Sequence, residues 1–95
     1  MQGRVRHLIA AAEKAAHLGS LTRAVSLFKT AVRLDPHHPP VYLHLADLYL
    51  ALAMEGEAER AARECLTRSM AARDLQTGSA ALAFLSALAR PSDPN

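Results

Sequence analysis

The residues of this chain that could do chemistry are five histidines and one cysteine. His37 and His38 are adjacent in a proline-rich stretch, and His44 follows them in an apolar segment. A metal site on a helix needs two histidines four residues apart, or a pair of cysteines, and the sequence has neither arrangement. We therefore expect no metal and no cofactor, and we assign His37 and His38 to a solvated turn.

A nucleophile is the other chemistry to consider. Cys65 is the sole cysteine, so it cannot form a disulfide within the chain. It lies in an apolar helical pattern, where a small buried side chain is a simpler interpretation than a catalytic thiol. The sequence contains neither G-x-S-x-G nor a glycine-rich phosphate loop. We therefore predict that the protein has no catalytic residues and is not an enzyme.

Composition favours one helical domain. The chain has 95 residues, of which 51% are hydrophobic, and alanine and leucine make up most of this fraction. Both are strong helix formers, whereas the aromatic residues that favour strands are only 4% of the chain. Length and composition together predict a single all-α domain.

Charge and hydropathy restrict the partners. The net charge is only +2, which argues against the alternative of a nucleic-acid-binding module built on the cations of the first two helices. No segment has the length of a signal-peptide core or of a membrane span, so we expect a cytoplasmic protein that does not bind membranes. The cations of the nucleic-acid-binding alternative are Arg4, Arg6, Arg23, Lys29 and Arg33.

Turn-forming residues divide the chain into helix-length segments. The spacing of apolar residues predicts helices at 4–18, 21–34, 39–53, 56–70 and 74–89, with a disordered tail at 91–95. Gly19 suits the left-handed end of the first helix, and we place another turn at Glu55 and Gly56. Ser20 and Asp74 are candidate N-caps.

The pattern of these helices repeats with a period of 34 residues. Tyr42-x-x-Leu45-Ala46-x-x-Tyr49 lies one period after Leu8-x-x-Ala11-Ala12-x-x-Ala15, and Ala24 is matched by Ala58. The chain resembles the tetratricopeptide repeat family, whose pattern is W-x-x-L-G-x-x-Y, then A-x-x-x-F, then P. Ala24-x-x-x-Phe28 and Leu34-Asp35-Pro36 match its second half, and the resemblance covers about residues 5–70.

The second unit departs from the family pattern at two places. Ala62 stands where a phenylalanine is usual, and Met70 stands where the proline is usual. One period further on, Ala80 and Ala83 fall in register, but no bulky residue does. The last helix is therefore interpreted as a cap, or as the first helix of an incomplete third unit.

The resemblance implies a right-handed superhelical α-solenoid of stacked hairpins over residues 1–90. Its units are expected at about 5–38 and 39–72, followed by the cap helix at about 74–89. Small residues would allow the paired helices to approach closely, and aromatic rings would fill the space between hairpins. The small residues are Ala12, Ala24, Ala46 and Ala58; the rings are Phe28, Tyr42 and Tyr49.

The resemblance also implies a non-catalytic protein-interaction module, such as a scaffold, an adaptor or a chaperone-like protein. Its first helices would line a concave groove that binds a peptide or a helix of a partner. We expect an apolar ligand with a basic residue near Glu13 and Asp47. The predicted groove residues are Arg6, Ile9, Glu13, Ala16, Leu43, Asp47 and Leu50.

The last helix is unusually apolar for the end of a repeat array, which normally has a polar outer face. Leu82, Phe84, Leu85 and Leu88 spread over about 160° of this helix at 100° per residue. These four residues are a candidate surface for self-association, as in a homodimer, or for docking of a partner.

Overall fold

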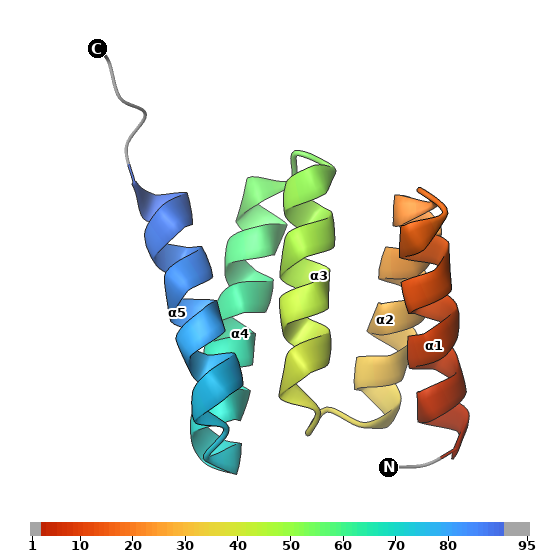
Figure 1. Cartoon of the computed structure of the whole chain (residues 1–95), viewed down its shortest axis with the longest axis horizontal. Coiled ribbons are helices and arrows are strands. Elements are labelled where there is room, and N and C mark those ends of the chain that lie inside the picture. The colour runs from red at the N-terminus through yellow and green to blue at the C-terminus, as the bar shows by residue number, and fades with distance from the viewer. Residues whose placement is uncertain (1–2, 91–95) are drawn as a thin grey trace.

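The computed structural model describes residues 3–90, which form five α-helices joined by short turns. Consecutive helices run in opposite directions and stand in series from α1 to α5 (Figure 1). The predicted all-α architecture of sequential antiparallel hairpins is therefore confirmed, while the predicted tail at 91–95 lies outside the described residues. The helices are α1 (Gly3–His17), α2 (Leu21–Leu34), α3 (Pro39–Ala51), α4 (Glu55–Ala72) and α5 (Leu75–Ala89).

Left-handed residues end three of the helices. Gly19 has a φ of 82°, as expected, and Ala53, one period later, has a φ of 61°. The turn predicted at Glu55 and Gly56 is wrong, because both residues lie in the first turn of α4. The chain turns instead at residues 52–54, where alanine takes the conformation that glycine takes in the first unit. Arg73, with a φ of 57°, ends α4.

The two candidate N-caps behave differently. The carboxylate of Asp74 accepts a hydrogen bond of 3.0 Å from the backbone N–H of Thr77, so Asp74 caps α5 as expected. Ser20 occupies the N-cap position of α2, but its side chain makes no capping hydrogen bond, which corrects the prediction. The ion pairs Glu59–Arg63 and Glu64–Arg68 stabilise α4 at distances of 2.8 and 2.7 Å.

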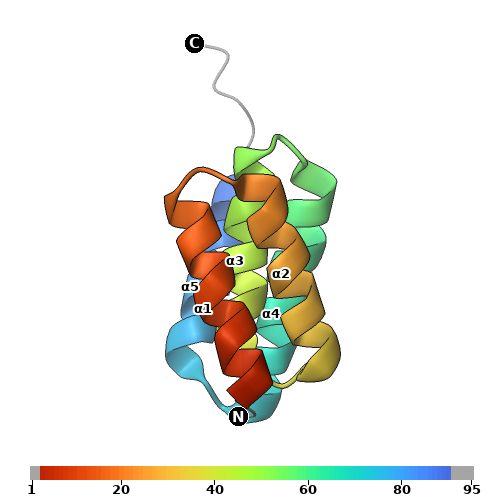
Figure 2. The ribbon, with the colours of Figure 1, turned by 90° about the vertical axis from the view of Figure 1, so that its right-hand side faces the viewer.

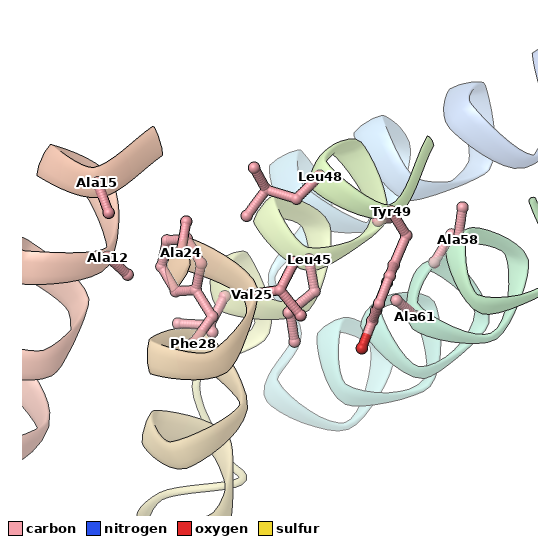
Figure 3. Packing of buried hydrophobic residues seen from close by; sticks show 13 residues of the cluster. Ala12, Ala15, Ala24, Val25, Phe28, Leu45, Leu48, Tyr49, Ala58 and Ala61 are labelled. Atoms are coloured by element: carbon pink, nitrogen blue, oxygen red, sulfur yellow. The ribbon is translucent and has the colours of Figure 1, made fainter. Parts of the chain in front are cut away.

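The main core lies where α1 to α4 meet. The alanines at 12, 24, 46 and 58 are completely buried, which fits their expected place at close helix crossings. Phe28 of α2 points toward Leu45 of α3, and Tyr49 lies between α3 and α4 with its ring toward Ala61 (Figure 3). Phe28 therefore packs between the two hairpins as expected, whereas Tyr49 packs between α3 and α4 within the second hairpin.

A second cluster joins α3, α4 and α5 through Tyr42, Cys65 and Ala81. Its polar atoms are satisfied: the Tyr42 hydroxyl donates a hydrogen bond of 3.0 Å to the Pro36 carbonyl, and the Cys65 thiol donates one of 3.4 Å to the Pro39 carbonyl. The first bond ties α3 to the turn that follows α2, and the second joins α4 to the start of α3 within the second hairpin.

Alternate helices fall on opposite sides of the stack. Viewed along it, α1 and α5 lie on one side, and α2 and α4 lie on the other (Figure 2). The first helix of each unit can therefore contribute to one common face.

Candidate functional site

The predicted groove residues lie on α1 and α3. Glu13 of α1 and His44 of α3 approach each other between these helices, with 4.0 Å between the carboxylate Oε2 and the imidazole Nε2. The imidazole also stacks on Phe28 of the main core. His44 thus links the two helices that form the groove to the core beneath them.

The apolar groove residues are partly anchored in the two cores. Ile9 and Ala16 of α1 pack against the main core, whereas Leu43 of α3 packs against the second cluster, toward α5. Leu50 is 41% exposed and makes no contribution to either cluster. Arg6 is exposed near the start of α1, in a hollow with His7. The predicted groove therefore combines apolar side chains that pack against the two cores with one, Leu50, that does not.

Two of the predicted groove residues, Glu13 and Asp47, carry carboxylates. Partial burial of the Asp47 carboxyl raises its pKa above the ordinary value of 3.8, and the nearby His44 lowers it in part. Within residues 3–90, no lysine or arginine forms an ion pair with Asp47 or Glu13. A cation brought by a ligand would therefore stabilise the charged form of Asp47.

A hollow of about 740 Å³ opens beside Glu13, at the end of the groove where α1 finishes. His44 and Ala16 line it from within the groove, and Leu18, 74% exposed, lines its outer edge. Lys14 and His17 complete the lining. The hollow therefore offers an apolar wall with charged groups around it.

His44 is not among the residues that the sequence predicts for the groove, yet it lies beside Glu13. From the sequence it was considered only with the histidines of the turn, as a possible metal ligand. Its place one residue after Leu43 and three before Asp47 puts it at the edge of the same helical face. That spacing could have identified it as a groove residue.

The apolar residues of α5 do not all share one surface. Phe84 and Leu85 pack partly against the main core, so Phe84 is turned inward. Leu82 is 53% exposed, and it lines two hollows between α4 and α5; Leu85 and Leu88 line one of them. The exposed apolar surface is therefore centred on Leu82.

The described residues bear on three other classes of site, which are metal-binding, membrane-spanning and nucleic-acid-binding. Within residues 3–90, no group of three or more histidine, cysteine or acidic side chains is gathered to hold a metal ion. No helix in this range is long and apolar enough to cross a membrane. The five cations of the nucleic-acid alternative, on α1 and α2, are all exposed.

Comparison with known proteins identifies the repeat. A search of curated proteins found no significant match. A family model described as tetratricopeptide repeat matches residues 15–87, more than half of the chain, from the end of α1 into α5. The match includes the last helix, which the pattern of the sequence left outside the resemblance. Repeats of this kind are typically non-catalytic and generally mediate protein–protein interactions. With its serial helix hairpins and this match, the chain belongs to the tetratricopeptide repeat family.

Proposed function

We propose that this domain is a scaffold, adaptor or chaperone-like protein that binds a peptide or a helix of a partner protein along the face of α1 and α3. The observation that supports this most is the pair of carboxylates, Glu13 and Asp47, which lie among exposed or half-buried apolar residues and form no ion pair with a lysine or an arginine of residues 3–90. Such a surface favours an apolar segment that carries a lysine or an arginine.

The test is selection of peptides from a random displayed library by the immobilised domain. We expect the selected peptides to combine apolar residues with at least one basic residue, and to bind the free domain in a fluorescence anisotropy assay. Leu50→Glu should abolish this binding, because it places a charge on the apolar part of the groove. Peptides enriched equally by the Leu50→Glu variant would contradict the proposal.

Leu34 provides a matched control for Leu50. It is 39% exposed, close to the 41% of Leu50, but it lies at the end of α2, away from the groove. Leu34→Glu should therefore leave peptide affinity unchanged. Asp47→Lys should instead reverse the preference from basic to acidic peptides, since it changes the sign of the groove charge without removing apolar surface.

The same preparations test the nucleic-acid alternative. Binding to random duplex or single-stranded DNA that weakens steeply with salt, together with no peptide selection, would favour the exposed cations of α1 and α2 as the functional surface.

A further inference from the structure

Charge is divided unevenly between the first hairpin and the rest of the chain. Residues 3–34, which form α1 and α2, contain six lysines and arginines and one acidic residue, Glu13, and so have a net charge of +5. Residues 35–90 contain five arginines and seven acidic residues, and so have a net charge of −2. The small charge of the whole sequence, +2, therefore conceals a strongly basic first hairpin.

Most of the positive charge lies on α2, which has three cations and no acidic residue. Arg23, Lys29 and Arg33 are all exposed, and at 100° per residue they fall within about 120° of the helix, opposite its buried side. We define the basic face of α2 as these three cations together with Ser26 and Thr30. Because α2 lies with α4 on one side of the stack (Figure 2), this face is separate from the predicted groove on α1 and α3.

The cations of α4, the corresponding helix of the second unit, are arranged differently. Each of the three arginines of α4 forms an ion pair with a glutamate three or four residues before it. Within residues 3–90, no cation of the basic face forms an ion pair with an acidic side chain. Arg33 instead donates a hydrogen bond of 3.2 Å to the hydroxyl of Thr30. The charge of the basic face is therefore not neutralised within the described chain.

The cations also lie close to one another. Lys29 and Arg33 are four residues apart on α2, a spacing at which like charges destabilise a helix and a glutamate at the earlier position would stabilise it. Arg23 and Lys14 of α1 line one hollow, of about 280 Å³, beside the turn between α1 and α2. The first hairpin thus has two pairs of like charges, and an anionic partner would convert their repulsion into attraction.

We propose that the basic face of α2 binds an acidic segment of a partner protein, which forms ion pairs with Arg23, Lys29 and Arg33. The helix rises about 15 Å from Arg23 to Arg33. An extended chain covers that length in about five residues, so a short run of aspartate and glutamate reaches all three cations. The surface is independent of the proposed groove, and the two partners can bind at the same time.

A short acidic segment fits this surface better than a nucleic acid does. The basic face contains no aromatic side chain on which a base could stack. A nucleic acid longer than α2 would continue toward α4, which lies on the same side of the stack and contains four glutamates. Like charges would then oppose its phosphates, whereas a segment as short as α2 avoids them.

Binding of fluorescent hexaglutamate, followed by anisotropy at physiological ionic strength, tests the proposal. The wild-type domain should bind this peptide, and Arg33→Glu should weaken the binding by at least about tenfold. Arg60→Glu is the matched control, because it makes the same change in net charge at an exposed arginine of α4 and should have little effect. No binding by the wild type, or an equal loss from both variants, would overturn the proposal; circular dichroism checks the fold of each variant.

A short oligothymidylate of the same charge as hexaglutamate tests the choice of partner. It should bind more weakly than the peptide, since it lacks carboxylates at the spacing of the cations and finds no ring to stack on. Equal or tighter binding of the oligothymidylate, lost in Arg33→Glu, would overturn the assignment to an acidic protein segment and favour a nucleic acid.

Lys29→Glu separates binding from stability. It replaces the like-charge pair with a glutamate four residues before Arg33, which is the orientation that stabilises a helix, so the Tm should rise by roughly 2–5 °C. Binding of hexaglutamate should be lost at the same time, because a negative charge then stands at the centre of the basic face. A lower Tm would overturn the proposal, since it would mean that Lys29 already has a stabilising partner within the folded chain.

Discussion

The imidazole of His44 stacks on the ring of Phe28, with 5.3 Å between ring centroids and 13° between ring planes. Phe28 is almost completely buried at the centre of the main core, whereas the His44 side chain is half exposed on the groove. The stack therefore connects the first hairpin to the second beside the proposed binding surface. Its removal is a direct test of how much this contact stabilises the fold.

His44→Ala should lower the free energy of unfolding by about 0.5–1.5 kcal/mol, the usual contribution of an aromatic pair. Because the histidine is half exposed, we expect the lower part of this range. Urea denaturation measures the change. His7→Ala, which removes an exposed histidine of α1, is the control and should have no effect. Equal losses from both substitutions would show that the stack does not stabilise the protein.

Asp74→Ala should destabilise the protein far more than Ser20→Ala. Both residues occupy N-cap positions, but only the Asp74 side chain accepts a hydrogen bond from its helix. We expect Asp74→Ala to lower the Tm by roughly 5 °C, and Ser20→Ala to leave it almost unchanged. Thermal unfolding followed by circular dichroism compares them. A larger loss for the serine variant would contradict the capping geometry.

The effect of Asp74 should also depend on pH. Its hydrogen bonds with Thr77 lower the pKa of the carboxyl below the ordinary value of 3.8. A lowered pKa in the folded state means that the stabilisation is present above the unfolded pKa, and is lost as pH falls through the folded one. The difference in Tm between wild type and Asp74→Ala should therefore be constant near neutral pH and shrink below 3.8. Asp74→Asn, which retains an oxygen acceptor, should show a weaker dependence.

The sequence was sufficient to predict the hairpins but not every turn. Gly19 was identified because glycine is the usual left-handed residue, and the same rule wrongly favoured Gly56. Ala53 adopts the left-handed conformation one period after Gly19, so the repeat was the more reliable guide there. Composition could not predict the left-handed conformation of Ala53, because alanine normally avoids it and adopts it here where α3 packs on α4.

The register of α5 could not be predicted from the period of 34. Arg68 corresponds to Leu34, the last residue of α2, yet α4 continues to Ala72 before the chain turns. Ala80 and Ala83, which the period of 34 places in register with buried Ala46 and Tyr49, are exposed, and Ala81 is buried instead. The predicted groove is less affected by this shift, because Glu13 and His44 lie on α1 and α3, for which the period of 34 holds.

Exchanging the residues at the two equivalent turns should have opposite effects. Ala53→Gly should raise the free energy of unfolding by about 0.5–1 kcal/mol, because it relieves the strain of a positive φ. Gly19→Ala should lower it by about 1–2 kcal/mol for the same reason; nothing crowds a Cβ there, so the backbone alone accounts for the change. Urea denaturation of both variants measures these values. Two changes of the same sign would show that the turns are not equivalent.

Cys65 should be unreactive in the folded protein despite being a free thiol. It is completely buried in the second cluster, and this burial raises the pKa of its thiol above the ordinary value of 9.0, which its hydrogen bond with Ser69 offsets in part. Thiolate is therefore scarce at neutral pH, and the sulfur is also shielded from reagents. Labelling with a disulfide reagent should be slow in buffer, fast in urea, and limited by unfolding. A Leu82→Cys variant supplies an exposed thiol in the same chain, since Leu82 is 53% exposed, and should label rapidly. Rapid labelling of native Cys65 would mean that α5 opens from α3 and α4 without unfolding of the rest.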